Sequence, residues 1–130
     1  MKNKHQGVSC LYKFIDAFNT AEKNNIITNL HFPHYVHSNG NEPVIYKNGE
    51  DFWKSLSVQL DTMIKVENWS FSTLDKCKII NKTDKTLQCE VEFNRRLINK
   101  KSYGSAKGIW ISTYIDGIWA LQIRSMIPIS

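Results

Sequence analysis

A long hairpin is predicted for the last quarter of the chain, from Tyr103 to Met126, and this feature constrains the fold most. Two runs of β-branched and aromatic residues are joined there by Asp116-Gly117. Asp-Gly between such runs is one of the strongest short-range signals for a tight β-turn. The sequence therefore predicts two long antiparallel strands, against which the rest of the chain must pack.

The segment before this hairpin also has the pattern of β-structure. Apolar residues at 87, 89, 91 and 93 alternate with polar residues at 88, 90, 92 and 94. Such alternation is typical of an antiparallel strand with one buried face and one solvated face. Residues 69–80 alternate less cleanly, and turns are predicted over 81–85 and 98–102. The second half of the chain is thus predicted to form four long antiparallel strands.

The first half of the chain is predicted to contain the helices. Residues 8–24 have an apolar stripe at helical spacing, and a short helical turn over 26–30 follows. Pro33 disfavours helix, so a strand is predicted over 34–38. A second short strand covers 44–46, which Pro43 places near a sheet edge. The second main helix is predicted over 50–64.

Segregation of helices from long antiparallel strands predicts an α+β fold, with a single domain over residues 1–130. Two helices must then cover one face of a strongly bent sheet. A curved sheet that is closed by a helix encloses an apolar interior, which is a common form of small-molecule pocket.

Composition limits the classes of partner. The chain has 130 residues, of which 42% are hydrophobic, with a net charge of +5 and a pI of about 9.1. The lysines fall in predicted turns and outer faces, so the charge is interpreted as solvated surface and a nucleic-acid partner is not expected. The apolar runs are too short for a membrane span, and no signal peptide is recognised. Three cysteines without a CxxC motif indicate free thiols and a cytoplasmic location.

Three short segments carry a resemblance to a known family. They are Leu30-His31-Phe32-Pro33-His34, Phe52-Trp53 at the start of the second helix, and Tyr114 to Ser125 around the Asp-Gly turn. With the order of the elements, they resemble the nuclear-transport-factor-2-like superfamily, in its uncharacterised bacterial branch. This is the cone-shaped fold of ketosteroid isomerase, scytalone dehydratase and the SnoaL-like polyketide cyclases.

The resemblance implies a cystatin-like α+β roll, in which a curved, mixed sheet wraps around the N-terminal helices. It also implies a pocket between helix and sheet, and a homodimer through the outer face of the sheet. It does not imply a reaction, because this fold hosts enzymes and non-enzymes. Ketosteroid isomerase needs a carboxylate base on its early strand, and residues 34–38 here contain no acid, so that mechanism does not carry over.

Two residues are candidates for catalysis. His34 is expected at the mouth of the cone, where an unperturbed pKa of about 6.5 suits proton transfer; the alternative is a structural histidine bonded to a carbonyl. Arg124 interrupts an apolar strand. If it faces the cavity, its guanidinium can bind a carboxylate or stabilise an enolate, whereas on the outside it forms a surface or interface ion pair.

His31, His34 and His37 are spaced by three residues, but neighbouring positions of a strand face opposite ways and no acid or cysteine completes a set. No metal site is therefore predicted. No phosphate-binding loop or catalytic triad is present either, and no cofactor is expected. Six residues are predicted to contact a ligand, with core packing as the alternative: Tyr12, Ile15, Phe32, Trp53, Trp69 and Trp110.

The sequence thus predicts a small-molecule-binding protein of the SnoaL-like or ketosteroid-isomerase-like fold, with an apolar or aromatic ligand. Acid–base isomerisation, cyclisation or dehydration would use His34 as the acid or base and Arg124 or Tyr12 as the electrophilic partner. The alternative is a non-catalytic, dimeric ligand-binding or protein-interaction module. The sequence does not decide whether the protein is an enzyme.

Overall fold

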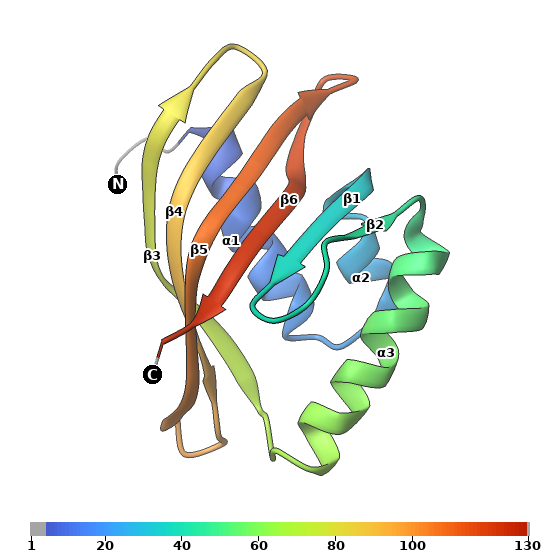
Figure 1. The fold of residues 1–130 in the computed structure, drawn as a ribbon, viewed down its shortest axis with the longest axis vertical. Helices are drawn as coiled ribbons and strands as arrows, with labels where there is room; N and C mark the ends of the chain where they lie inside the picture. Colours follow the sequence, from blue (N-terminus) through green and yellow to red (C-terminus); the bar gives the residue numbers. More distant parts are fainter. Residues whose placement is uncertain (1–4, 130) are drawn as a thin grey trace.

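The computed structural model describes residues 5–129, with three helices and six strands in that range. In chain order, the elements are α1 (Gln6–Phe18), α2 (Lys23–Ile27), β1 (Leu30–Ser38), β2 (Val44–Tyr46), α3 (Gly49–Lys65), β3 (Phe71–Lys82), β4 (Thr86–Arg96), β5 (Ser102–Ile115) and β6 (Ile118–Pro128) (Figure 1).

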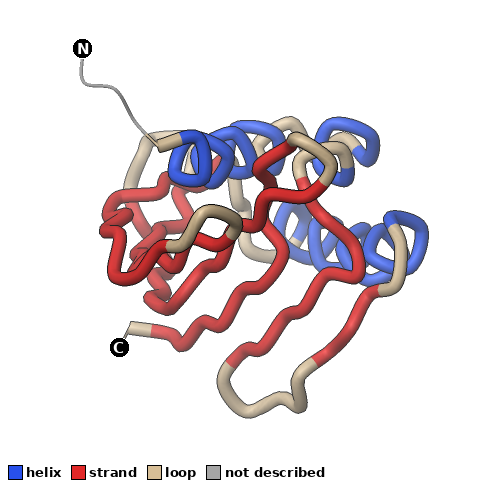
Figure 2. The backbone as a smooth tube through the Cα atoms, turned by 90° about the horizontal axis from the view of Figure 1, so that it is seen from above, coloured by secondary structure: helices blue, strands red, loops and turns tan. Residues whose placement is uncertain are grey.

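One curved sheet joins all six strands in the order β2-β1-β6-β5-β4-β3. The β1–β6 pair is parallel and the other pairs are antiparallel. Figure 2 shows the helices gathered on one side of this sheet. The α+β class is therefore confirmed, with a mixed sheet wrapped around the N-terminal helices. None of the helices in the described range is long and apolar enough to cross a membrane.

The predicted hairpin is present and consists of β5 and β6. Both of its turn residues have positive φ, 51° at Asp116 and 79° at Gly117. A two-residue turn with this conformation has the twist that joins antiparallel strands without splaying them. The alternation predicted for β4 is also confirmed, since Leu87, Cys89 and Val91 are completely buried on its inner face.

The first helix is shorter than predicted and ends at Phe18 rather than at residue 24. The amide of Asn19 donates to the carbonyl of Ser72 at 2.9 Å, and its oxygen accepts from the Ser72 N–H at 2.8 Å. These two bonds hold the end of α1 against β3. Ala21 then adopts a φ of 55°, which turns the chain into α2, three residues earlier than the predicted helical turn.

The strand predicted over 34–38 begins four residues earlier, at Leu30. Its pairing with β6 is shifted between Leu30 and Tyr35, and this irregularity contains Pro33. A proline has no N–H to give to a ladder, so within sheets it is found at edges and irregularities. β2 itself matches the predicted residues and forms the edge of the sheet, as Pro43 indicated.

The N-terminal end of α1 packs directly on the sheet at Gly7. The Ser112 hydroxyl donates to the Gly7 carbonyl at 2.9 Å. A Cβ at Gly7 would lie 2.8 Å from the Ser112 Oγ and 2.9 Å from Leu87 Cδ2, so a larger side chain would force the helix away. This end of the interior is therefore filled, and any internal space must lie towards the other end of the helix.

Candidate functional site

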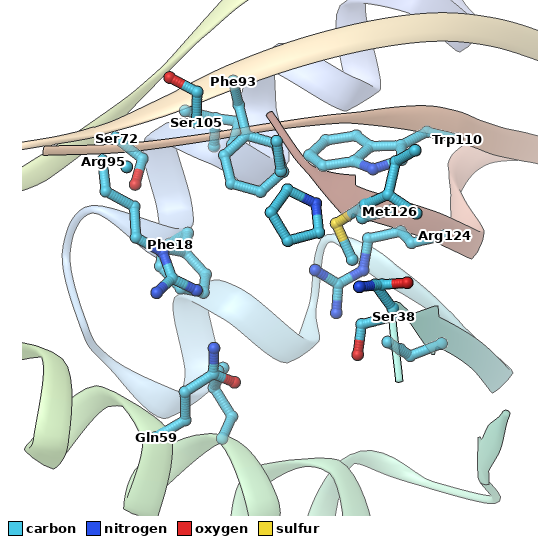
Figure 3. A pocket seen from close by; sticks show the side chains of 18 of the residues that line it. Phe18, Ser38, Gln59, Ser72, Phe93, Arg95, Ser105, Trp110, Arg124 and Met126 are labelled. Carbon is cyan, nitrogen blue, oxygen red and sulfur yellow. The ribbon is translucent and has the colours of Figure 1, made fainter. Parts of the chain in front are cut away.

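A cavity of about 490 Å³ lies between the sheet and the helices α1 and α3 (Figure 3). Pockets for small molecules typically measure about 300–1,000 Å³. The side chains around it are mostly apolar and aromatic. The lining comprises Phe14, Ile15, Phe18, Val36, Ser38, Asn39, Asn41, Leu56, Gln59, Ser72, Phe93, Arg95, Tyr103, Gly104, Ser105, Ala106, Trp110, Arg124, Met126, Ile127 and Pro128.

The cavity is open beside β5 because two of its lining residues, Gly104 and Ala106, have little or no side chain. Gly104, Ala106 and Gly108 alternate along the strand and stand opposite inward-facing residues of β4. A Cβ at Gly104 would have no neighbour within 4 Å, whereas one at Gly108 would collide with the Ser125 carbonyl of β6. Trp110, two residues further along the same face, is almost fully buried and ends the open stretch.

Arg124 points into the cavity because of a bulge in β6. Ser112 pairs with Leu121, but the preceding residue of β5, Ile111, pairs with Ile123, so Gln122 is an extra residue. The extra residue changes which side chains share a face. Leu121 and Arg124 consequently both face inward, although uniform alternation would place them on opposite faces. Gln122 itself donates to the Pro33 carbonyl at 2.9 Å.

Aromatic rings and one imidazole hold the Arg124 guanidinium. Its Cζ lies 5.1 Å from the centroid of Phe14 on α1 and 5.9 Å from that of Phe52 on α3. A cation over a ring face is attracted by the ring quadrupole. Arg124 Nε donates to His34 Nε2 at 3.3 Å. Burial lowers the pKa of Arg124 to about 10, which leaves it charged at neutral pH.

His34 is completely buried on the inner side of β1. Burial, together with the nearby positive charge of Arg124, lowers its pKa to about 2. The carbonyls of His31 and Leu121 act in the opposite direction, although Nδ1 forms no hydrogen bond within residues 5–129. Since Nε2 accepts a hydrogen bond from Arg124, the neutral ring carries its own proton on Nδ1.

Trp110 supplies a second polar group beside Arg124. The two residues are direct cross-strand partners on β5 and β6, so their side chains share the inner face. The indole Nε1 is buried and has no hydrogen-bond partner among the described residues. Figure 3 shows this nitrogen on the side of the ring that faces Met126 and Arg124.

A second arginine lies at the far end of the cavity. Arg95 pairs with Gly104, six residues before Trp110 on β5, which corresponds to about 20 Å along an extended strand. Its Nη1 is 3.4 Å from Glu67 Oε1, and the same oxygen accepts from the Tyr103 hydroxyl at 2.7 Å. Burial and the Glu67 carboxylate raise the pKa of Tyr103 to about 12.

The two candidates for catalysis, His34 and Arg124, are brought into contact. Arg124 lines the cavity, whereas His34 lies behind it and outside the lining. The other two histidines of the segment bond elsewhere, His31 to the carbonyl of Ile118 and His37 to the hydroxyl of Ser125. No group of three or more histidine, cysteine or acidic side chains suited to a metal is found among residues 5–129.

Of the six predicted ligand contacts, Ile15 and Trp110 line the cavity and the other four do not. Trp69 is buried in the core, where its indole donates to the Ser72 hydroxyl at 2.9 Å. Tyr12, Phe32 and Trp53 are partly buried and pack against the core from outside. Their roles in binding stay predictions.

Several lining residues were not predicted, above all Phe14, Phe93 and the small residues of β5. Phe14 lies in the middle of the buried face of α1, which also contains Val8, Leu11, Ile15 and Phe18 of the predicted stripe but not Tyr12. Gly104 and Ala106, at alternate positions of β5, are the sequence signal for the cavity. The inner face of β5 would be expected to carry large core side chains, and at these positions it does not.

The fold has many counterparts among solved structures. A protein from Novosphingobium aromaticivorans, described as NTF2-like with a cystatin-like fold, matches with a TM-score of 0.71 at 8% identity, over 96% of this chain and 80% of that one. The chain has the nuclear-transport-factor-2-like fold. No family model matches the sequence, and a comparison with curated proteins finds no match.

Two further structures show the same fold. A ketosteroid isomerase-like protein from Erwinia carotovora atroseptica has a TM-score of 0.65 at 12% identity, over 99% of both chains. A protein from Catenulispora acidiphila, in complex with S-DNPA, has a TM-score of 0.73 at 11% identity, over 95% of this chain and 90% of that one. At such identities the likeness extends to the nuclear-transport-factor-2-like backbone and not to the side chains of the cavity.

Proposed function

We propose that this protein binds one small apolar or aromatic molecule per chain in the cavity of about 490 Å³. The observation that carries the proposal is the pair of small lining residues on β5, Gly104 and Ala106, which leaves an aromatic-lined space open within a well-packed domain. The likeness to the Catenulispora protein, which was solved with S-DNPA, supports a ligand-binding use of the fold.

Binding without acid–base turnover is the version that the site supports best. A general acid or base works best when its pKa lies near the working pH. The pKa of His34 is lowered to about 2 by its burial and by Arg124, so its ring stays neutral under ordinary conditions. Isomerase, cyclase or dehydratase chemistry through His34 stays a prediction, and it would require a bound ligand to raise this pKa.

A neutral fluorescent probe tests the proposal. N-phenyl-1-naphthylamine brightens in apolar surroundings, and we expect saturable binding of one molecule per chain. Ala106→Phe should abolish this binding, because the new ring would occupy the space beside Gly104 and Phe93. Lys107→Phe adds the same ring on the exposed outer face of β5 and should bind the probe as the wild type does.

Absence of probe binding to the folded wild type would contradict the proposal. Equal binding to the wild type and to Ala106→Phe would contradict it as well, because the probe would then lie outside the cavity.

A second role, self-association through the outer face of the sheet, has an observation of its own. One apolar row crosses four neighbouring strands on this face. It consists of Ile45 on β2, Tyr35 on β1, Ile123 on β6 and Ile111 on β5, which are paired in register. Ile45 is 59% exposed and Tyr35 is 37% exposed. A contiguous apolar patch on a protein surface commonly marks an interface. We propose that a second copy of this chain covers the row.

Sedimentation velocity tests the proposed dimer. The wild type should sediment with the mass of two chains, and Ile123→Glu should give single chains because a charge cannot be buried unpaired. Ile98→Glu is the matched control, since Ile98 is 88% exposed in a turn away from the row. A monomeric wild type at micromolar concentration would refute the dimer.

A further inference from the structure

We infer that the natural ligand of the cavity is an anion, an aromatic or alicyclic carboxylate whose carboxylate group binds Arg124 and whose ring lies along β5. This inference rests on the proposed function, because it names the chemical class of the molecule that fills the same cavity.

The first argument is the charge balance of the lining. Among the described residues, two cations and no carboxylate line the cavity. Arg95 is compensated by Glu67 at 3.4 Å. Arg124 has no ion pair with any described residue; it donates a hydrogen bond to the imidazole of His34, and its Cζ lies near the rings of Phe14 and Phe52. The phenol of Tyr46 is also close enough to act on the pKa of Arg124. The uncompensated charge at this end of the cavity favours a negatively charged ligand.

The second argument is the hydrogen-bonding capacity of Arg124. A guanidinium has five N–H donors in a planar fork, and the fork matches the two oxygens of a carboxylate. Nε is directed at His34, while neither terminal nitrogen makes a hydrogen bond to a described residue. The rings of Phe14 and Phe52 restrict the plane of the group. The fork is therefore held in place, with its donors available to a ligand.

His34 acts as a positioning residue in this arrangement. It accepts a hydrogen bond from the Nε–H of Arg124, so it orients the guanidinium. Because the ring is buried and neutral, it does not cancel the positive charge as an aspartate or glutamate at the same place would. A strand residue that both orients an arginine and leaves its charge uncompensated suits an anion site.

The indole N–H of Trp110 provides a further hydrogen-bond donor next to the Arg124 guanidinium. Trp110 Nε1 is buried without a partner among residues 5–129, although buried indole N–H groups usually have one. Since Trp110 and Arg124 are cross-strand neighbours on the inner face, one ligand group can accept from both. An acceptor in this position would satisfy the orphaned donor.

The remaining walls define the body of the ligand. Phe18, Phe93 and Met126 surround the space over Gly104 and Ala106 (Figure 3). Aromatic side chains around a flat strip of glycine and alanine favour a planar ring over a branched chain. Apolar and aromatic residues outnumber polar ones around the rest of the cavity, so the rest of the ligand is expected to be mainly apolar.

Two ligands of nearly equal shape, one charged and one neutral, distinguish the contribution of the carboxylate charge to binding from that of the aromatic ring. We expect 2-naphthoate to bind the wild type about 10- to 100-fold more tightly than 2-naphthamide in isothermal titration calorimetry, the range expected for charged hydrogen bonds. Arg124→Met keeps an unbranched apolar side chain and should remove this preference, while the affinity for 2-naphthamide stays within a few-fold. Arg95→Met is the matched control and should keep the preference, because Arg95 is already paired with Glu67.

If Arg124→Met fails to fold, Arg124→Lys provides a second test of the role of Arg124. It retains the charge without the planar fork, so a preference for 2-naphthoate should persist but be weaker. Equal binding of the two probes by the wild type would overturn this inference and leave the proposed function standing. Loss of the preference in Arg95→Met but not in Arg124→Met would also overturn it. If neither probe nor N-phenyl-1-naphthylamine binds, both the inference and the proposed function fail.

Discussion

Arg95 and Arg124 line the same cavity, but within the described part of the chain only Arg95 has a carboxylate partner. Arg95 shares Glu67 with the hydroxyl of Tyr103, so the charge at that end is satisfied by the protein itself. Arg124 lies between phenyl rings and donates to a neutral imidazole. The comparison shows that the partner of a lining charge, rather than the charge alone, distinguishes a structural residue from one that is free to bind.

The two ends of the cavity also differ in the direction in which they shift the pKa of a neighbouring side chain. At the Arg95 end, burial and the Glu67 carboxylate raise the pKa of Tyr103 to about 12. At the Arg124 end, burial and the guanidinium lower the pKa of His34 to about 2. Each neighbour thus favours the neutral form of the group beside it, but only at the Arg124 end does a net positive charge remain.

The largest effect is expected when Arg124 is given the partner that Arg95 has. Val36 lines the cavity and pairs with Arg124 across β1 and β6. A carboxylate in Val36→Glu should occupy the guanidinium and lower the affinity for 2-naphthoate about 10- to 100-fold, the range expected for charged hydrogen bonds. The affinity for 2-naphthamide should change little, and calorimetry measures both.

Val36→Gln is the control for this change, because it adds a side chain of the same shape without a charge. It should keep the preference for 2-naphthoate. If Val36→Glu and Val36→Gln lower the affinity for 2-naphthoate equally, bulk rather than charge controls binding and the distinction between the two arginines is wrong.

A smaller effect is expected on the pH dependence of stability. In the folded protein His34 stays neutral down to a pKa of about 2, whereas in the unfolded chain it takes up a proton near its ordinary value of 6.5. Lowering the pH through 6.5 therefore stabilises the unfolded chain. This group alone should remove about 1.4 kcal/mol of unfolding free energy between pH 7.5 and pH 5.5.

His34→Gln tests this expectation by urea unfolding at the two pH values. Glutamine keeps an oxygen that can accept from Arg124 Nε, but it does not titrate. The variant should lose about 1.4 kcal/mol less than the wild type over this range. The same loss in both proteins would show that His34 is protonated in the folded state, and that Arg124 has a cationic rather than a neutral neighbour.

The parts of the fold that depend on local sequence were predicted correctly. The Asp116-Gly117 turn, the alternation of β4 and the edge strand after Pro43 each depend on a few adjacent residues. The end of α1 was predicted wrongly because it depends on Asn19 bonding to Ser72, which is 53 residues away. No helical pattern contains that contact.

The site was predictable only in part, for a similar reason. Arg124 was a candidate because a charge within an apolar strand is visible in the sequence, but two orientations were left open. The bulge at Gln122 decides between them, and it arises from the register of β6 against β5. The roles of Phe14 and Phe93 depend on how α1 and β4 meet across the cavity, which no local pattern determines.

A crystal structure of the complex with 2-naphthoate tests the central claim most directly. We predict one molecule per chain, with both carboxylate oxygens within hydrogen-bonding distance of the Arg124 guanidinium and the naphthalene ring over Gly104 and Ala106. A ligand whose carboxylate binds Arg95 instead, or one that lies on the outer face of the sheet, would contradict this account of the cavity.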